Sequence, residues 1–373
     1  MRFTANDKYI VSCSADSSVR IWNLKKKVQE AVLQGHTKLV MDVIISNCSR
    51  YIISASNDKT VRVWNFQRKQ QEFAIENLFS EIRSIAITGS SQYIIYGLRN
   101  GEVTVHNFQT KQQEAIFQGH TDSVVSLAVT NDCRFIVSGS WDHTVRVWDI
   151  QNKRQVSVLS GHTKVVLSVA ITGNDDRIIS CSSDKSIRVW DFKTKNLETV
   201  LKGCDNHLLG VAITKDNRFL VSGSDDSNIR LWNLQRVEQP IVFQGHSNCV
   251  NCVVLTSDDT SIISGSGDFT IRVWSIPHKR QLAVLKGHTS SVNCIAITHN
   301  DKYIVSGSSD KTVRVWNLEK GIQEASLIGH TNSVTKVGIT SDDIYAISSC
   351  FNNGSEVRIW DLQTKKEKAV FLK

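Results

Sequence analysis

Short apolar stretches alternate with turn residues along the whole 373-residue chain. One period begins at Ser291, where SVNCIAIT, YIVSGSSD, TVRVWNL and QEASLIGH are separated by turn residues such as Asn300-Asp301. Within TVRVW, apolar and polar residues alternate with a period of two and β-branched residues are frequent, a pattern typical of strands. No stretch carries a sustained helical period. The pattern predicts an all-β protein with four short strands in each period.

A tryptophan recurs once in each period, every 42 residues. At one of these recurring positions His106 stands in place of the tryptophan. The tryptophans are Trp22, Trp64, Trp148, Trp190, Trp232, Trp274 and Trp316, then Trp360 after a shift of two residues. A four-stranded unit cannot bury both of its faces without neighbours, so such self-similarity predicts a stacked repeat array. Only two prolines and no Ser/Gly-rich or charged tract interrupt it. We therefore expect one continuous array over residues 1–373.

A Gly-His pair stands 28 residues ahead of most of these tryptophans. The pairs are Gly35-His36, Gly119-His120, Gly161-His162, Gly245-His246, Gly287-His288 and Gly329-His330. In units of about 40 to 45 residues ending in Trp-Asp or Trp-Asn, this arrangement resembles the WD40 repeat family over essentially the whole chain. The resemblance implies a β-propeller, in which each unit forms a four-stranded antiparallel blade around a central channel.

The resemblance also implies a structural tetrad in each blade, made of a His before the innermost strand, a Ser in the second strand, an Asp in the next turn and a Trp in the third strand. Five units match it completely. The sets are His36, Ser54, Asp58, Trp64; His120, Ser138, Asp142, Trp148; His162, Ser180, Asp184, Trp190; His246, Ser264, Asp268, Trp274; and His288, Ser306, Asp310, Trp316.

Ser, His and Asp together also make up nucleophilic triads. A catalytic constellation is needed once per site, whereas five equivalent copies are what a buried hydrogen-bond network requires. We therefore interpret the tetrads as structural and expect no enzymatic activity, no catalytic residue and no cofactor. An arginine two residues before the tryptophan is interpreted in the same way, with its guanidinium directed toward a turn acid. These arginines are Arg62, Arg146, Arg188, Arg230, Arg272 and Arg314.

Three units depart from the pattern. The third has Leu78, Tyr96, Asn100 and His106 at the tetrad positions, which predicts that the network cannot form there. In the sixth, Cys204 replaces the His while Ser222, Asp226 and Trp232 are retained. In the ninth, residues 351–354 lengthen the turn and remove the Asp, while His330, Ser348 and Trp360 stay. Departures inside a regular array tend to mark specialised contacts or boundaries.

Counting third strands gives nine units, and the first has an innermost strand cut short at Met1–Thr4. Members of the family more often close with about seven or eight blades. The alternative to a single array is a piece of a longer double propeller, with two orphan blades in 1–77 and a seven-bladed propeller in 78–373. The degenerate third unit slightly favours this alternative, because terminal repeats are usually atypical.

Partners of the family usually dock on the top face, which is lined by the third and fifth residues after the Gly-His histidine and by the residue before the turn Asp. The resulting candidate binding residues are Trp141, Arg83, Arg99, Leu39, Met41, Val165, Leu167, His207 and Leu209. Units seven and eight offer only small or polar residues there, namely Cys249, Asn251, Gly267, Ser291, Asn293 and Ser309. Trp141 lies outside the recurring tryptophan positions, and an exposed Trp near Arg is typical of a binding hot spot. The alternative is that Trp141 folds over its own blade and the aliphatic residues fill the channel.

The net charge of +8 permits binding to a polyanion but does not select one. Many cations fall in the hairpins between third and fourth strands: Lys25, Lys26, Lys27, Arg68, Lys69, Lys153, Arg154, Lys193, Lys195, Lys279, Arg280, Lys365, Lys366 and Lys368. Acidic turns share that face, so we favour a solvated rim of mixed sign, with a weak polyanion contact as the alternative. No nucleic-acid motif accompanies these residues.

Nine scattered cysteines and an N-terminus without a signal-like apolar run favour a reducing compartment, the cytoplasm or alternatively the nucleus. Cys249 and Cys252 form a single pair without further ligands, so no metal site is expected. The apolar runs are too short to span a bilayer, and no membrane insertion is expected.

The function expected from these features is a non-catalytic scaffold or adaptor that docks proteins or peptides on its top face as a subunit of a larger complex. One alternative is a substrate-recognition subunit of a ubiquitin ligase or another modification complex, reading a short linear motif through Arg83 and Arg99. The other is a basic propeller that binds RNA or another polyanion, which would show steep salt dependence.

Overall fold

The computed structural model describes residues 2–4, 6–26, 28–76, 78–202, 208–236, 238–350 and 356–371. These residues form 36 β-strands and no helix. The strands make nine antiparallel sheets of four, and each sheet takes four strands that are consecutive in the chain. The expected all-β architecture of nine four-stranded propeller blades is thereby confirmed.

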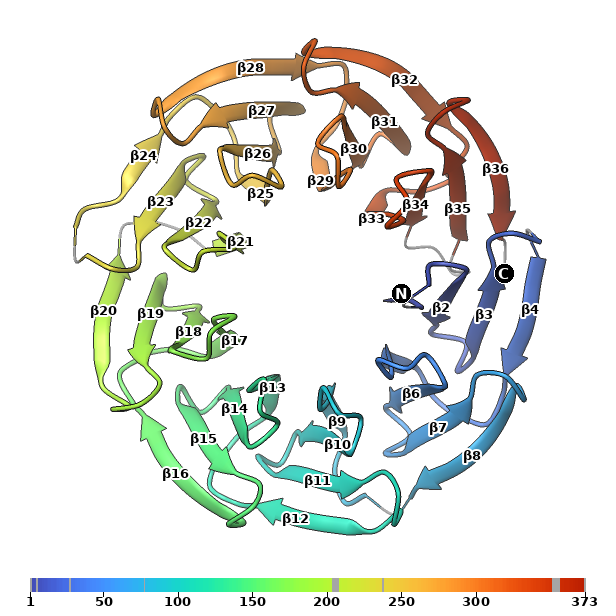
Figure 1. Cartoon of the computed structure of the whole chain (residues 1–373), viewed down its shortest axis with the longest axis vertical. Coiled ribbons are helices and arrows are strands. Elements are labelled where there is room, and N and C mark those ends of the chain that lie inside the picture. The colour runs from blue at the N-terminus through green and yellow to red at the C-terminus, as the bar shows by residue number, and fades with distance from the viewer. Residues whose placement is uncertain are drawn as a thin grey trace. The chain divides into compact units, whose positions relative to one another are not determined.

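The chain divides into two compact units, Met1–Lys202 with five sheets and Gly203–Lys373 with four (Figure 1). The strands of the first unit are β1 (Arg2–Phe3), β2 (Tyr9–Cys13), β3 (Val19–Asn23), β4 (Val28–Leu33), β5 (Val40–Ile45), β6 (Tyr51–Ser56), β7 (Val61–Asn65), β8 (Gln70–Ile75), β9 (Ile82–Ile87), β10 (Tyr93–Leu98), β11 (Val103–Asn107), β12 (Gln113–Phe117), β13 (Val124–Val129), β14 (Phe135–Ser140), β15 (Val145–Asp149), β16 (Arg154–Leu159), β17 (Val166–Ile171), β18 (Arg177–Ser182), β19 (Ser186–Asp191) and β20 (Leu197–Lys202). The two-residue β1 agrees with the predicted truncation of the first innermost strand.

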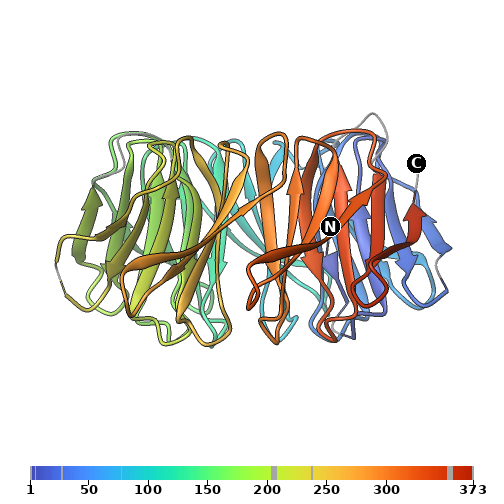
Figure 2. The same cartoon turned by 90° about the horizontal axis from the view of Figure 1, so that it is seen from above.

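The strands of the second unit are β21 (Leu208–Ile213), β22 (Phe219–Ser224), β23 (Ile229–Asn233), β24 (Ile241–Phe243), β25 (Val250–Leu255), β26 (Ser261–Ser266), β27 (Thr270–Ser275), β28 (Arg280–Lys286), β29 (Val292–Ile297), β30 (Tyr303–Ser308), β31 (Thr312–Asn317), β32 (Ile322–Ile328), β33 (Val334–Ile339), β34 (Tyr345–Cys350), β35 (Glu356–Asp361) and β36 (Lys366–Phe371). In Figure 2 the strands of this unit, yellow to red, run between two rows of turns.

Burial along each sheet explains why the units stack. In the fourth sheet, β14 is almost wholly buried, whereas the outermost strand β16 is largely exposed. The second strand is apolar on both faces because a neighbouring sheet covers each one. Ile95 and Val105 of the third sheet share one apolar core with Val124, Ile136 and Trp148 of the fourth. A single sheet therefore cannot complete its own core, which is the physical basis of the repeat.

Each complete innermost strand carries a β-bulge near its start. In the fourth sheet Val124 pairs with Ser140 and Ser126 with Gly139, so Val125 has no partner opposite it. The same irregularity occurs in β5, β9, β17, β21, β25, β29 and β33. A bulge redirects a side chain and interrupts the ladder, so one residue per strand is released from the sheet's own packing.

Candidate interaction surface

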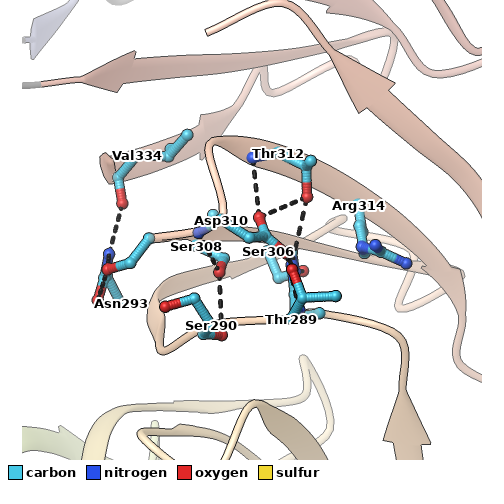
Figure 3. A network of polar contacts seen from close by, with 12 residues as sticks. Thr289, Ser290, Asn293, Ser306, Ser308, Asp310, Thr312, Arg314 and Val334 are labelled. Carbon is cyan, nitrogen blue, oxygen red and sulfur yellow. Dashed lines mark hydrogen bonds and ion pairs between the residues drawn. The ribbon is translucent and has the colours of Figure 1, made fainter. Parts of the chain in front are cut away.

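The five tetrads form continuous chains of hydrogen bonds. Each His Nδ1 lies 2.7 or 2.8 Å from its Asp, each His Nε2 lies 2.7 or 2.8 Å from its Ser Oγ, and each Trp Nε1 donates to the same Oγ at 2.8 or 2.9 Å. The structure thus brings all four members together in each of these sheets. The five serines have no exposed surface, so their hydroxyls are inaccessible to a substrate. Figure 3 shows the surroundings of Ser306 and Asp310 in the eighth sheet.

The protonation states of these groups follow from burial. Burial lowers the pKa of His36, His120, His162 and His288, and their hydrogen bonds to Asp only partly offset it. Burial also opposes ionisation of Asp184, but hydrogen bonds from Ser186, Thr163 and His162 outweigh it and hold its pKa at about 2. A neutral imidazole therefore donates its Nδ1–H to an ionised carboxylate, while Nε2 accepts the serine hydroxyl.

The partner of the third-strand arginine differs between sheets with the tetrad histidine and sheets without it. In the first and sixth sheets, Arg20 and Arg230 pair with the turn acids Asp16 and Asp226, each at 2.7 Å. In the tetrad sheets the His binds the Asp, and Arg146 and Arg272 donate instead to a fourth-strand Gln at 2.5 Å. Arg62 and Arg314 also bond a Gln, and Arg188 donates to the carbonyl of Gly161. The interpretation that such an arginine can direct its guanidinium toward a neighbouring turn acid thus holds for Arg230. Arg62 also lies 3.9 Å from Glu76, which follows β8.

The third sheet has no tetrad, as its sequence predicts, but it has a substitute. Tyr96 and His106 occupy the Ser and Trp positions, and the Tyr96 hydroxyl lies 3.1 Å from His106 Nδ1. Gly101 forms the turn after β10 with φ of +91°, and a Cβ there would lie 2.2 Å from the carbonyl oxygen of His120. Glycine is therefore required for the close approach of the third and fourth sheets.

Two kinds of turn meet at one edge of the first unit. The backbone N–H groups of Asn57, Arg99, Trp141 and Ser183 donate to the carbonyls of Leu39, Glu81, Ser123 and Val165, respectively. Each bond ties the turn after a second strand to the turn before an innermost strand. The bulge residues at this edge are Met41, Arg83, Val125 and Leu167. We call these turns and bulge residues together the bulge edge.

Large apolar side chains are exposed along the bulge edge. Leu39, Met41, Trp141 and Leu167 are between 37% and 46% exposed, while Val165 is half-buried. Phe79, in the turn before β9, is 92% exposed. Phe79 is not among the binding residues expected from the repeat pattern. The sequence feature that could have identified it is the apolar pair Leu78-Phe79 in a turn where other units have His-Thr. His207 and the side chain of Leu209 lie outside the described residues.

The two arginines of the bulge edge share one acid. Arg83 lies 3.0 Å and Arg99 3.4 Å from the same carboxylate oxygen of Glu81. Arg99 has 61% of its side chain exposed. The three side chains together carry one net positive charge beside the exposed aromatic residues.

Two of the corresponding bulge residues of the second unit, Asn251 and Asn293, bond within the protein. Asn293 donates to the carbonyl of Val334 at 2.9 Å (Figure 3). It also donates to the hydroxyls of Ser333 and Ser309 at 3.0 Å. Asn251 likewise donates to the carbonyl of Val292 in the next sheet at 2.9 Å. These asparagines therefore join neighbouring sheets, whereas Met41 and Leu167 present apolar groups to solvent.

Several hairpin lysines pair with acids of the preceding sheet. Lys69 lies 2.6 Å from Glu30, Lys153 2.9 Å from Glu114 and Lys365 3.2 Å from Glu324. The basic hairpins are therefore partly neutralised, in keeping with a rim of mixed sign.

Four-stranded sheets in chain order, with buried His–Ser–Asp–Trp networks, define the class as a WD40-type β-propeller. The family model described as WD domain, G-beta repeat, matches residues 238–275, 279–317 and 321–361. The chain belongs to the family described as the IFT122 first beta-propeller, whose model matches residues 1–233. Families of WD40 propellers are generally non-catalytic.

Among solved structures, the chain is similar to the crystal structure of the computationally designed Ika8 protein. The two share 26% sequence identity with a TM-score of 0.68, over 88% of this chain and 98% of that one. No curated protein matches the chain. Among the described residues there is no helix that could span a membrane.

Proposed function

We propose that the chain is a non-catalytic scaffold, acting as a subunit of a larger complex, whose bulge edge binds a segment of a partner protein. One observation carries the proposal. At the same bulge position, the first unit presents Met41 and Leu167 to solvent, whereas the second unit uses Asn251 and Asn293 for bonds between its own sheets. Exposed apolar residues at a position that can serve internal packing indicate a surface reserved for a partner.

The chemistry of the partner follows from the exposed groups. Trp141 and Phe79 offer flat apolar surface, and aromatic residues with arginine dominate binding energy at protein interfaces. Arg83 and Arg99 have only Glu81 between them, so an acidic group on the partner would balance the remaining charge. The fitting partner is a segment with apolar and acidic side chains.

A second candidate function is recognition of a short linear motif by a substrate-binding subunit of a ubiquitin ligase or another modification complex. The exposed guanidinium of Arg99 favours it, because arginine binds carboxylate and phosphate groups in a bidentate manner. Binding to RNA or another polyanion has weaker support, since the hairpin lysines Lys69, Lys153 and Lys365 are paired with acids.

The proposal includes the cellular compartment of the protein. Six cysteines among the described residues are free thiols: Cys48, Cys133, Cys249, Cys252, Cys294 and Cys350. This supports a reducing compartment, with the cytoplasm as our proposal and the nucleus as the alternative.

Affinity purification with mass spectrometry tests the proposal by comparing the wild type with Trp141→Ala/Arg99→Glu. Both side chains are exposed, so we expect an unchanged melting temperature and loss of the co-purifying partners. The matched control is Phe269→Asn, which removes an exposed turn aromatic of the second unit at a φ of 71° that Asn tolerates. Unaltered partner recovery with the double variant would refute the assignment of the bulge edge.

A further inference from the structure

The ninth sheet keeps the tetrad histidine but changes its surroundings. His330 Nε2 lies 2.6 Å from Ser348, which also accepts the indole N–H of Trp360 at 2.7 Å. Cys350 ends the second strand at the position where the five tetrad sheets have a serine, and the carboxylate beside the histidine comes not from a turn aspartate but from Glu356, the first residue of β35. The five serines are Ser56, Ser140, Ser182, Ser266 and Ser308, and each donates its hydroxyl to a backbone carbonyl.

These replacements leave one nitrogen without a hydrogen bond. In the five tetrads, His Nδ1 lies within 2.8 Å of the Asp carboxylate. In the ninth sheet, His330 Nδ1 is 3.6 Å from Glu356 Oε2 and has no hydrogen-bond partner among the described residues, although its side chain is completely buried. A buried nitrogen without a hydrogen bond lowers the stability of the folded state. Its presence here indicates that a bound group not belonging to the sheet interacts with it.

Two further potential ligand atoms lie near this nitrogen. Cys350 Sγ lies 3.3 Å from Glu356 Oε2, and the sulfur, the carboxylate oxygen and a nitrogen of His330 all lie within 4.8 Å of one another. Neighbouring ligand atoms of a tetrahedral zinc site, with bonds of about 2.0–2.3 Å, are about 3.3–3.8 Å apart. Two of the three separations already have this length.

We propose that His330 Nδ1, Cys350 Sγ and Glu356 Oε2 form a binding site for one divalent ion of borderline softness, Zn²⁺. Imidazole nitrogen, thiolate sulfur and carboxylate oxygen are each ligands that Zn²⁺ accepts. Three protein ligands leave a fourth position for water or for a side chain of a partner. Binding releases the thiol proton to solvent, and the thiolate and carboxylate then balance the two charges of the ion.

The surroundings of the three ligands suit this role. Thr331 donates its hydroxyl to Glu356 Oε2 at 3.1 Å, and Arg358 Nε contacts the other carboxylate oxygen, so both orient the glutamate. With Nδ1 on the ion, Nε2–H would donate to Ser348, the contact that fixes the ring orientation of metal-bound histidines.

Zn²⁺ titration of the whole chain by calorimetry, with Co²⁺ absorption as a second readout, tests the site. Cys350→Ser introduces the serine that the five tetrad sheets carry, so the variant is expected to fold, and Glu356→Gln keeps the shape of the glutamate. We expect one Zn²⁺ per chain, at least about 100-fold weaker binding in both variants, and loss of the Co²⁺–thiolate charge-transfer band in Cys350→Ser. Cys48→Ser, at an exposed cysteine, is the matched control and should retain the band.

Two results would overturn the proposal. One is the absence of Zn²⁺ binding by the wild-type chain. The other is binding whose affinity is the same in the wild type, Cys350→Ser and Glu356→Gln.

Discussion

The hydroxyl of Tyr96 and Nδ1 of His106 form a hydrogen bond of 3.1 Å between β10 and β11, inside the third sheet. In the tetrad sheets the same two positions are a serine and a tryptophan, bonded at 2.8 or 2.9 Å. Both partners have changed, yet the cross-strand bond is kept. The physical requirement is that buried polar groups satisfy one another, and it can be met by more than one residue pair.

Removing the Tyr96 hydroxyl tests this requirement. Tyr96 is completely buried, so Tyr96→Phe should lower the free energy of unfolding by about 1–2 kcal/mol, because His106 loses its partner. The measurement is the midpoint of urea unfolding. Tyr93→Phe is the control and should cost little, since the Tyr93 hydroxyl accepts a hydrogen bond from the exposed amide of Gln92. Equal midpoints for Tyr96→Phe and the wild type would contradict the structural role of the pair.

Stability should fall in mild acid. Burial lowers the pKa of His106 from 6.5 to about 4, so the unfolded chain binds more protons than the folded chain between these values. The contribution of neutral His106 is therefore complete above about pH 6.5 and is lost as the pH falls toward 4. Burial shifts the pKa of His36, His120, His162 and His288 in the same direction.

Melting temperatures measured between about pH 7.5 and pH 5 check this dependence. His106→Asn should make the acid loss shallower, because one of the titrating rings is gone. His143→Gln, at an exposed histidine, should leave the pH profile unchanged. A melting temperature that is independent of pH over this range would be inconsistent with neutral, buried imidazoles.

The tetrad of the eighth sheet should depend on its carboxylate. Asp310 accepts from His288 at 2.7 Å and from the backbone N–H of Thr289 at 3.1 Å. Asp310→Ala leaves both donors without an acceptor. We therefore expect the free energy of unfolding to fall by about 2–3 kcal/mol and the melting temperature to be lower. Glu319→Ala removes an exposed carboxylate from the same sheet and should be nearly neutral. The tetrad would have no stabilising role if the two variants melted alike.

The bonds of Asn293 should stabilise the second unit. Its amide bonds Ser309 in its own sheet and Val334 in the next. Asn293→Ala should therefore cost about 1–2 kcal/mol in urea unfolding. Thr335→Ala at the bulge of the ninth sheet is the matched control, because the Thr335 hydroxyl makes one long bond of 3.4 Å. If Asn293→Ala unfolded at the same urea concentration as Thr335→Ala, the bond between the sheets would contribute nothing measurable.

The fold follows from the sequence because its strongest signals are local. The 42-residue period and the alternation in segments such as Thr312–Trp316 predict the strands, and the need of each unit for neighbours predicts the stacking. Whether residues 1–77 and 78–373 belong to separate propellers stays a prediction.

The finer features of the site depend on cross-strand register, which the sequence does not reveal. His106 reaches Tyr96 because Ile94 pairs with His106, and Cys350 meets Glu356 because these two residues pair between β34 and β35. Cys249 and Cys252 stand out in the sequence because they are close together, whereas His330, Cys350 and Glu356 are brought together only by the fold. Likewise, the choice of arginine partner depends on whether a histidine has already taken the aspartate.

The β-bulges allow the residues of the binding surface to vary without a change in the residues that hold the sheets together. Because a bulge residue has no partner across the ladder, its replacement leaves the strand register unchanged. In the first unit, positions such as Met41, Arg83 and Leu167 can therefore vary while the sheets keep their cores and tetrads. A library randomised at these positions would alter what the surface binds and leave unchanged the residues of the core and the tetrads, which determine the fold.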